Sequence, residues 1–207
     1  KNTLVITVFL IFSAVLGFLA QIVFASTFGV SVEMDIYFKI LSIPAILTGI
    51  SPIIFSSVLI PAFAKFKSDK LGLNNFIGSI WIFIFAFGLF FILVGFVFST
   101  LNIDAFIPEN SADLKQIAIQ VALLVWIGSG LMIMSSFLSA ILNYDKQFFK
   151  VVWTSILPPF CMIIIVLLFH EFIGVRTIAL GFCISLLIQF LIFLNASKIS
   201  FNFSSFN

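Results

Sequence analysis

Residues 35–63 read DIYFKILSIPAILTGISPIIFSSVLIPAF, an apolar run long enough to cross a lipid bilayer as one helix. A bilayer core about 30 Å thick is crossed by roughly 20 helical residues. Similar runs lie before and after it, and they are too continuous for the alternating strands of a β-barrel. The sequence therefore predicts an all-α, polytopic transmembrane bundle with six spans, at residues 4–28, 35–63, 76–100, 114–142, 149–169 and 177–196.

The composition of the whole chain agrees with this prediction. Of 207 residues, 62% are hydrophobic and 9% are charged, whereas a soluble domain is about half apolar and about a quarter charged. So few polar side chains cannot cover a water-facing surface, which excludes a soluble enzyme, a disordered chain and a nucleic-acid binder. Cys161 and Cys183 fall within expected spans, where they act as small apolar residues, so neither a disulfide framework nor a metal site is expected.

The positions of the charged residues predict the orientation in the membrane. When the loops are assigned to alternate sides, seven lysines fall on one side, whereas Lys115 and Arg176 fall on the other. Because loops rich in basic residues stay in the cytoplasm, we expect both termini to lie inside. The seven are Lys1, Lys65, Lys67, Lys70, Lys146, Lys150 and Lys198.

The boundaries of the chain lead to an expectation about its organisation. We expect residues 1–198 to form one six-helix transmembrane lobe and residues 199–207 to begin a cytoplasmic connecting segment. The chain starts with Lys1 rather than with methionine, and its tail, ISFNFSSFN, ends without another span. From these features we expect either an excised segment or one half of something larger.

The second span differs from the others in its helix-breaking residues. It contains Pro44, Pro52 and Pro61 together with Gly49. Prolines in a membrane helix remove backbone hydrogen bonds, which hydroxyls, water or neighbouring helices must replace. We therefore expect Pro44 and Pro52 to bend this helix, and bent helices are typical of the moving parts of transporters. Pro61 and Gly29, near the two ends of the span, are further candidate structural or hinge positions.

One face of the second span is more polar than a lipid-facing helix would be. Spacings of three and four residues place seven positions on this face, and five of them are polar or small. The face is therefore expected to point into a helix bundle or a water-filled cavity. Asp35 precedes Lys39 by one turn, which favours an ion pair. The seven positions are Asp35, Lys39, Ser42, Ile46, Gly49, Ile53 and Ser56.

Lys39 has two possible roles. It lies only about 6 Å deeper in the membrane than Asp35, at about 1.5 Å per residue, so its side chain could extend to the outer surface and anchor the helix there. Alternatively, it meets the anionic part of a lipid-linked substrate, because charges inside a membrane are candidates for function. A lysine ammonium is a compact cation that suits a phosphate group.

Short motifs along the chain resemble those of a known transporter family. In that family the first helix carries Gly-Phe-x-Arg-Glu, followed by Phe-Gly-x-Ser, an Asp before aromatic residues, Ile-Pro-x-Leu and a closing Phe-x-Pro. SAILN at 139–143 and Phe148 are similar to the family's turn between helices four and five. The chain thus resembles the MurJ or MviN lipid II flippases of the multidrug/oligosaccharidyl-lipid/polysaccharide exporter superfamily. The corresponding motifs are GFLAQ at 17–21, FGVS at 28–31, DIYF at 35–38, IPAIL at 43–47 and LIPAF at 59–63.

The resemblance implies a fold and a function. It implies two six-helix lobes around a central cavity, of which this chain matches the N-terminal one. It implies a flippase rather than an enzyme, which moves an undecaprenyl-linked oligosaccharide such as lipid II across the bacterial cytoplasmic membrane by alternating access. The implied partners are the lipid-linked glycan, membrane lipids and a C-terminal lobe, in the same protein or a second chain. No cofactor, metal or nucleic acid is expected.

The chain departs from the family pattern at charged positions. Ala20 and Gln21 replace the Arg-Glu pair, and Thr48 and Gly49 stand where the pattern has arginines. Arginine grips phosphate through two parallel hydrogen bonds, which these residues cannot form. A flippase for exopolysaccharide or O-antigen units, a cation exporter of the superfamily and a non-transporting scaffold subunit therefore stay open. The candidate substrate-binding residues are Asp35, Lys39, Ser42, Gly49 and Gln21.

The remaining polar and aromatic residues indicate packing rather than chemistry. Buried polar residues in membrane helices usually form hydrogen bonds between helices, and small residues allow close helix contact. We assign the first role to Gln21, Gln120, Ser129 and Gln189, with cavity lining as the alternative for each. The close-contact face would comprise Gly128, Ser129, Gly130, Ser135 and Ser139, and Trp81, Trp126 and Trp153 would serve as packing or membrane-belt residues.

Overall fold

The computed structural model describes residues 2–66, 69–107 and 111–197, which fold into α-helices without a strand. The expected all-α class is confirmed, and six spans are long and apolar enough to cross a membrane. The expected segment 199–207 and three of the lysines, Lys1, Lys67 and Lys198, lie outside the described residues. The helices are α1 (Asn2–Phe28), α2 (Val32–Ala64), α3 (Lys70–Leu101), α4 (Ile103–Phe106), α5 (Ala112–Tyr144), α6 (Phe148–Thr154), α7 (Leu157–Ile173) and α8 (Arg176–Ser197).

Capping side chains start the helices earlier than the apolar runs suggest. Ser31 Oγ accepts a hydrogen bond from the Met34 backbone N–H (3.2 Å) at the start of α2, and Asp69 Oδ1 accepts one from the Gly72 N–H (2.9 Å) at the start of α3. These bonds satisfy backbone donors that a first turn leaves free. Residues 70–75, expected in a loop, are therefore helical.

Two glycines with positive φ end the spans at the opposite end of the bundle. Gly29 (φ 57°) follows α1, as the sequence predicts, and Gly174 (φ 63°) follows α7. Glycine tolerates this left-handed conformation because it has no Cβ. The fifth span runs past its expected end at residue 169, because α7 continues through His170 and Glu171 to Ile173.

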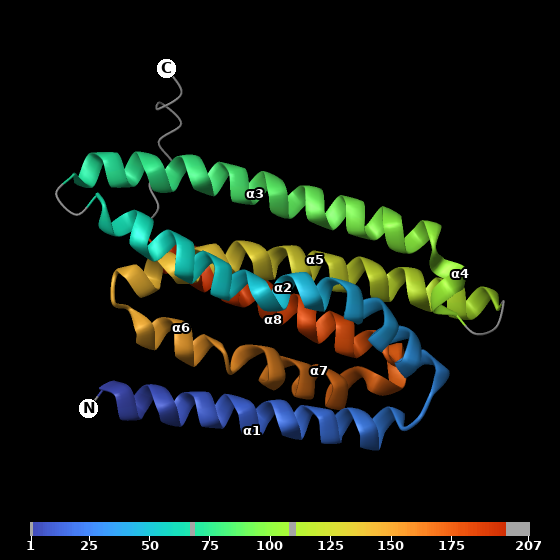
Figure 1. Cartoon of the computed structure of the whole chain (residues 1–207). Helices are drawn as coiled ribbons and strands as arrows, with labels where there is room; N and C mark the ends of the chain where they lie inside the picture. Colours follow the sequence, from blue (N-terminus) through green and yellow to red (C-terminus); the bar gives the residue numbers. More distant parts are fainter. Residues whose placement is uncertain (1, 67–68, 108–110, 198–207) are drawn as a thin grey trace.

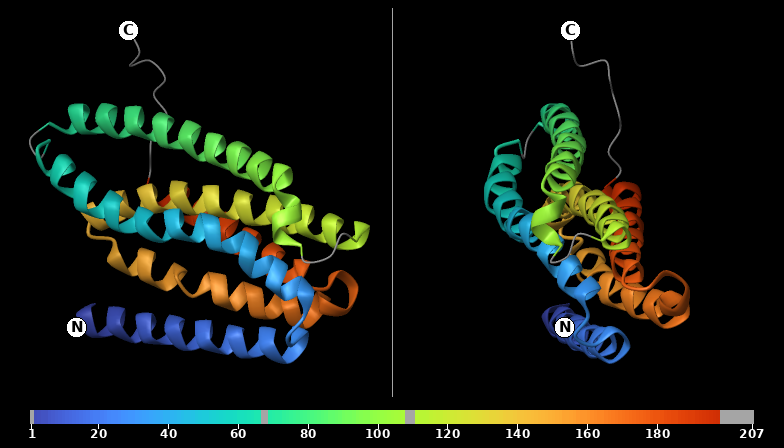
Figure 2. Two further views of the ribbon diagram at one scale, coloured as in Figure 1. Left: turned by 45° about the vertical axis from the view of Figure 1, so that its right-hand side comes forward. Right: turned by 90° about the vertical axis from the view of Figure 1, so that its right-hand side faces the viewer.

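The helices are arranged around α5, which is the central element. It packs against α2, α8 and α3, while α7 packs on α8, and α1 lies outermost against α6 and α7. Figure 1 shows this order from α3 at the top to α1 at the bottom, and Figure 2 shows α2 and α8 on different sides of α5. The N-terminus, the α2–α3 connection and the α5–α6 turn lie at one end of the bundle, as the loop assignment predicts (Figure 1).

The fifth span is broken, although the sequence predicts one continuous helix. α6 ends at Thr154 and α7 begins at Leu157. In an uninterrupted helix the carbonyl of Ser155 would accept from the N–H of residue 159, which is a proline without this donor. Ser13 Oγ of α1 donates to this carbonyl instead (2.8 Å). The break is therefore a consequence of Pro158 and Pro159, and a hydroxyl from the neighbouring helix compensates for it.

Small residues let the central helices approach closely, as the sequence predicts. A Cβ added at Gly128 would lie 2.8 Å from the Phe182 ring of α8, and one added at Gly130 would lie 3.1 Å from the Gly88 carbonyl of α3. The prediction of packing roles for two tryptophans is also confirmed. Trp126 is buried and its Nε1–H donates to Ser99 Oγ (2.8 Å), and Trp81 stacks on the Phe137 ring (5.8 Å between centroids).

Candidate functional site

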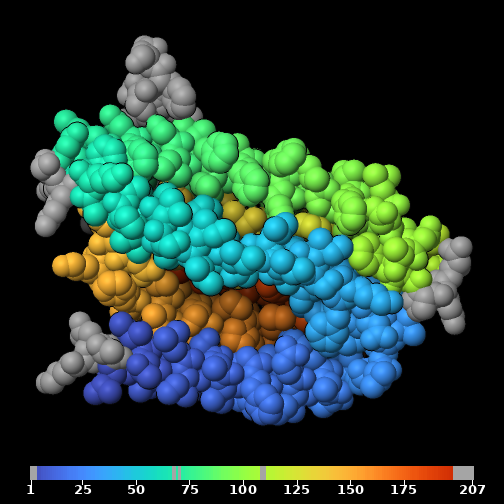
Figure 3. All heavy atoms as spheres, viewed as in Figure 1, coloured from blue at the N-terminus to red at the C-terminus, as the bar shows by residue number. Residues whose placement is uncertain are grey.

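The surface of the bundle is hollowed between α1 and α2. The two helices share a core cluster only near their connecting turn, where Ala20 and Phe24 of α1 join Met34 and Tyr37 of α2. Away from this turn α1 packs on α6 and α7 while α2 packs on α5, so the two diverge. Figure 3 shows the resulting hollow between the blue α1 and the light blue to cyan α2, with orange atoms of the fifth span and a few red atoms of the sixth span as its floor.

The polar stripe of α2 lies on the face turned away from α5. The buried residues of α2 include Tyr37, Ile40, Pro44, Thr48 and Ser51, which form one face. Each residue turns the helix by about 100°. Asp35, the first residue of the stripe, therefore lies about 160° around the helix axis from Tyr37 on the buried face. Since α2 crosses in front of α5 in Figure 1, the stripe looks outward on the side where the hollow opens.

The stripe is exposed along almost its whole length. Its exposed members are Asp35, Lys39, Ser42, Ile46, Gly49 and Ile53, and only Ser56 is half-buried. Within the described residues, no neighbouring helix covers this face. A row of polar and small side chains is therefore available to water, lipid or another protein element, and the expectation that it faces a water-filled cavity remains a prediction.

Asp35 and Lys39 do not form the ion pair that their spacing favours. Among the described residues the one ion pair joins Lys115 Nζ to Asp104 Oδ1 (2.8 Å). Exposed pairs on a helix contribute only about 0.3–0.5 kcal/mol, which is too little to fix two mobile side chains in one geometry. Lys39 is therefore unpaired by acids of the described part of the chain, and its charge is free to meet an anion.

A hydroxyl group replaces the backbone bond that Pro52 removes from α2. Pro52 cannot donate to the carbonyl of Thr48, and Ser51 Oγ donates to this carbonyl instead (2.9 Å). Ser51 Oγ also lies 3.0 Å from Ser136 Oγ of α5, which ties the bend to the central helix. Helix α2 thus stays helical through Pro44, Pro52 and Pro61 and follows a curved path (Figure 1).

The other sequence-predicted polar residues divide into two groups. Gln21 is exposed on α1, whereas Gln189 Nε2 of α8 lies 3.5 Å from Thr154 Oγ1 of α6, between helices as expected. The interhelical role predicted for Ser129 is wrong, because its hydroxyl donates to Val125 O within α5 (2.7 Å). Small buried hydroxyls satisfy their own helix most easily because the i−4 carbonyl is always within reach.

The four departures from the family pattern are not equivalent in space. Ala20 and Thr48 are buried in the bundle, and the Thr48 hydroxyl donates to Pro44 O (2.9 Å). Gln21 and Gly49 are exposed. Only the last two positions can therefore change what the outward surface of α1 and α2 offers to a ligand.

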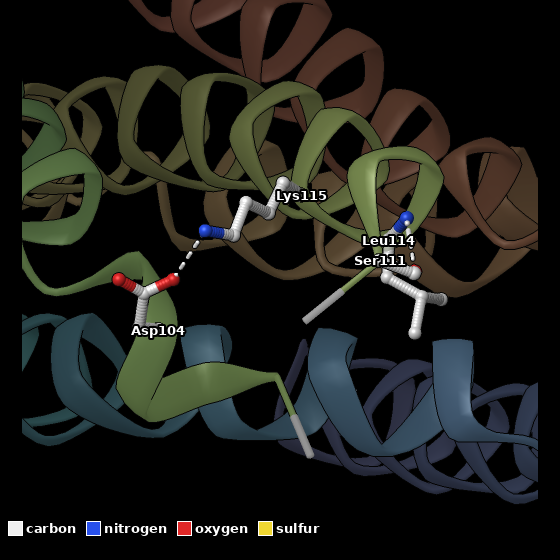
Figure 4. A network of polar contacts seen from close by, with 4 residues as sticks. All are labelled: Asp104, Ser111, Leu114 and Lys115. Atoms are coloured by element: carbon white, nitrogen blue, oxygen red, sulfur yellow. Dashed lines mark hydrogen bonds and ion pairs between the residues drawn. The ribbon is translucent and has the colours of Figure 1, made fainter. Parts of the chain in front are cut away.

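A polar network orders the opposite end of the bundle, where α3 connects to α5. Ser111 Oγ accepts from the Leu114 N–H (3.2 Å) and so caps α5, and the Asp104–Lys115 pair joins α4 to α5 one turn further on (Figure 4). The side chain of Asp104 is 74% exposed. Such an exposed pair fixes a connection rather than a ligand site, since water screens it.

No group of three metal-binding side chains occurs among residues 2–66, 69–107 and 111–197.

The important residues that the sequence did not predict are Ser13 and Ser51, which stabilise the two proline-bearing spans. The signal for Ser51 was its place directly before Pro52, in the turn that lacks a backbone donor. Ser13 had no such signal, because its acceptor lies 142 positions away in the chain.

Six spans with α5 at their centre, and a proline-bearing α2 whose polar face no described residue covers, define the class: a helical bundle of a multi-pass membrane protein. The family profile described as lipid II flippase MurJ matches residues 24–204. The chain belongs to this family.

Two further comparisons agree on the fold. The chain is 31% identical over 198 residues to the probable lipid II flippase MurJ of Buchnera aphidicola subsp. Acyrthosiphon pisum (strain APS), covering 84% of this chain and 38% of that protein. A solved structure described as lipid II flippase MurJ in an inward closed conformation superposes with a TM-score of 0.77 at 24% identity, over 97% of this chain and 43% of that one. The chain thus spans about two fifths of the length of these relatives.

Proposed function

We propose that this chain supplies one lobe of a flippase that moves an undecaprenyl-linked oligosaccharide precursor such as lipid II across the bacterial cytoplasmic membrane. Such a step would serve peptidoglycan and cell-wall synthesis. The observation that supports it is the polar stripe of α2, exposed beside the hollow between α1 and α2. Membership of the lipid II flippase family supports the choice of an anionic lipid carrier as substrate.

The proposed binding surface combines charge and small polar groups. Lys39 would meet the diphosphate, since a lysine without an acidic partner is a free point charge. Ser42, one turn further, already donates its hydroxyl to Lys39 O (2.7 Å), so it would act as an acceptor. Gly49 leaves room for the glycan, while Asp35 and Gln21 would bind its hydroxyl groups.

The proposed mechanism is alternating access between two lobes. The partner of this surface would be a C-terminal lobe, in the same protein or in a second chain, because a stripe facing outward needs an opposite wall to form a cavity. Two-lobe transporters bind substrate near the membrane midplane between their halves. The bends at Pro44 and Pro52, together with the turn at Gly29 and the end of α2 near Pro61, would let α2 follow the rocking of its lobe.

A second candidate is a flippase for exopolysaccharide or O-antigen repeat units. It stays a candidate because the chain departs from the lipid II flippase pattern at two exposed positions, Gln21 and Gly49. A glycine cannot grip a phosphate as the arginine of the pattern would. The two candidates share the lipid and the phosphate, so they differ only in the glycan.

The test is replacement of Lys39 by glutamine. We expect Lys39→Gln to abolish transport, because the diphosphate loses its cation, while membrane insertion stays normal. The measurement is the leaflet accessibility of labelled undecaprenyl-diphosphate sugars in vesicles, with the full-length protein and with this segment alone.

Lys65→Gln is the matched control, because Lys65 is an exposed lysine beyond the end of α2. It should transport at the unchanged rate. Normal transport by Lys39→Gln would remove the proposed role of this residue. Running the assay with lipid II and with an O-antigen carrier distinguishes the two candidates.

A further inference from the structure

A second pocket lies away from the stripe, at the lysine-rich end of the bundle. It has a volume of about 360 Å³ and lies between the first turns of α1 and the α5–α6 turn. Its walls include Val5 and Ile6 on one side and Lys146, Gln147 and Lys150 on the other. A pocket of this size is within the range of about 300–1,000 Å³ that small-molecule sites occupy.

The turn holds the two lysines in a defined position. Lys146 has a φ of 59°, a left-handed conformation that is uncommon for a residue with a side chain. Backbone bonds maintain it, from the Gln147 N–H to Leu142 O (2.8 Å) and from the Lys146 N–H to Asn143 O (3.1 Å). Lys150 follows on the first turn of α6. Among the described residues neither lysine has an ion-pair partner.

The neighbouring acid does not neutralise this charge. Asp145 forms no ion pair with Lys146 within the described part of the chain, and it does not line the pocket. Two cations therefore face the pocket without a fixed counter-charge.

Apart from Gln147, the other residues that line the pocket are apolar, and they belong to the first and fifth spans. Phe149 packs edge-on against Phe9 of α1 (5.4 Å between centroids), which joins the aromatic wall to the first span. Phe148 is 44% exposed and Phe149 is 53% exposed. Aromatic rings next to lysines are typical of the membrane–water boundary, where rings contact acyl chains and ammonium groups contact phosphates.

We propose that this pocket binds an anionic glycerophospholipid of the cytoplasmic leaflet. Its phosphate would lie between Lys146 and Lys150, and one acyl chain would lie along Val5, Ile6 and Phe149. Basic pockets between membrane helices on the cytoplasmic side recognise anionic headgroups in this way. The bound lipid would add a contact between α1 and the α5–α6 turn. This inference concerns a lipid that stays in its leaflet, and it does not depend on the transported substrate.

The test is native mass spectrometry of the full chain released from nanodiscs with equal phosphatidylglycerol and phosphatidylcholine. The wild type should retain phosphatidylglycerol in preference to phosphatidylcholine. A lysine near an anionic lipid contributes about fivefold, so the K146Q/K150Q double variant should lose roughly 20- to 30-fold of this preference. Val5→Trp, which fills the apolar wall without a change in charge, should also lower retention. Lys65→Gln, at the same end but outside the pocket, should leave it unchanged.

Several results would overturn the proposal. Equal effects of Lys65→Gln and Lys150→Gln would mean diffuse attraction to the surface, and full retention in Val5→Trp would mean that the pocket is not used. Release of phosphatidylglycerol by inorganic phosphate would reduce the site to a phosphate site. Displacement by equimolar undecaprenyl diphosphate would assign the pocket to the transported lipid instead.

Discussion

At the scale of single residues, the structure shows how a membrane helix tolerates proline. The carbonyl of Thr48 has lost its donor to Pro52 and receives one from Ser51, and the carbonyl of Ser155 has lost its donor to Pro159 and receives one from Ser13. An unsatisfied carbonyl in the bilayer core costs several kcal/mol. The serine hydroxyls are therefore part of the bent helices, and their removal is expected to cost more than removal of an exposed serine.

Ser51→Ala should lower the free energy of unfolding by about 1–2 kcal/mol, because it leaves the Thr48 carbonyl without the hydroxyl donor that replaces the missing N–H of Pro52. In a Pro52→Ala background the same change should cost less, since an alanine at position 52 restores the backbone N–H. Chemical unfolding in detergent micelles measures both. Ser57→Ala, whose hydroxyl is exposed, is the control. An equal cost of Ser51→Ala in both backgrounds would contradict this explanation.

At the scale of helices, the close contacts depend on which glycine faces a neighbour. A Cβ at Gly181 of α8 would lie 2.8 Å from the Met162 Cα of α7, whereas one at Gly17 of α1 would meet no heavy atom within 4 Å. A backbone atom cannot move aside as a flexible side chain can. The close contact between α7 and α8 therefore depends on the missing side chain at Gly181. Gly17 of α1 has no such role.

Gly181→Ala should destabilise the bundle by about 1–3 kcal/mol through overpacking. Gly17→Ala should be neutral or gain up to about 1 kcal/mol from helix propensity. Thermal unfolding of the two variants in the same detergent compares them directly. If Gly181→Ala unfolds at the temperature of Gly17→Ala, the contact between α7 and α8 is looser than this distance indicates.

At the scale of the whole molecule, the question is what covers the outer face of α2. The face opposite α5 carries the polar stripe, and α1 does not close over it but diverges from the turn at Gly29. If lipid covers this face, Ser42 and Gly49 lie in hydrocarbon. If a second lobe faces it across a cavity, the two residues are in contact with water. The cavity arrangement therefore predicts water access at the stripe.

Ser42→Cys should react with a membrane-impermeant maleimide in vesicles several-fold faster than Phe90→Cys, both in a C161A/C183A background. A thiol reacts as thiolate, which forms in water and not in hydrocarbon. Phe90 is the control because it is 62% exposed on α3, a helix that packs mainly on α5. Undecaprenyl diphosphate should protect the thiol at position 42 but not the thiol at position 90. Equal, slow labelling would place the stripe against lipid.

The sequence by itself determined the class of fold, the six spans and the family, because apolar length and short motifs are local properties. It also located the proline-rich helix and the small residues of α5 that pack closely. The tertiary structure decided which faces are covered: Thr48 is buried while Gly49, its neighbour, is exposed, and Asp35 and Lys39 form no ion pair with any residue that the structure describes. It also revealed the break before Leu157 and the pocket at Lys146. These depend on which helices meet, and contacts such as Ser13 with Ser155 join residues too far apart in the chain for any local pattern to show.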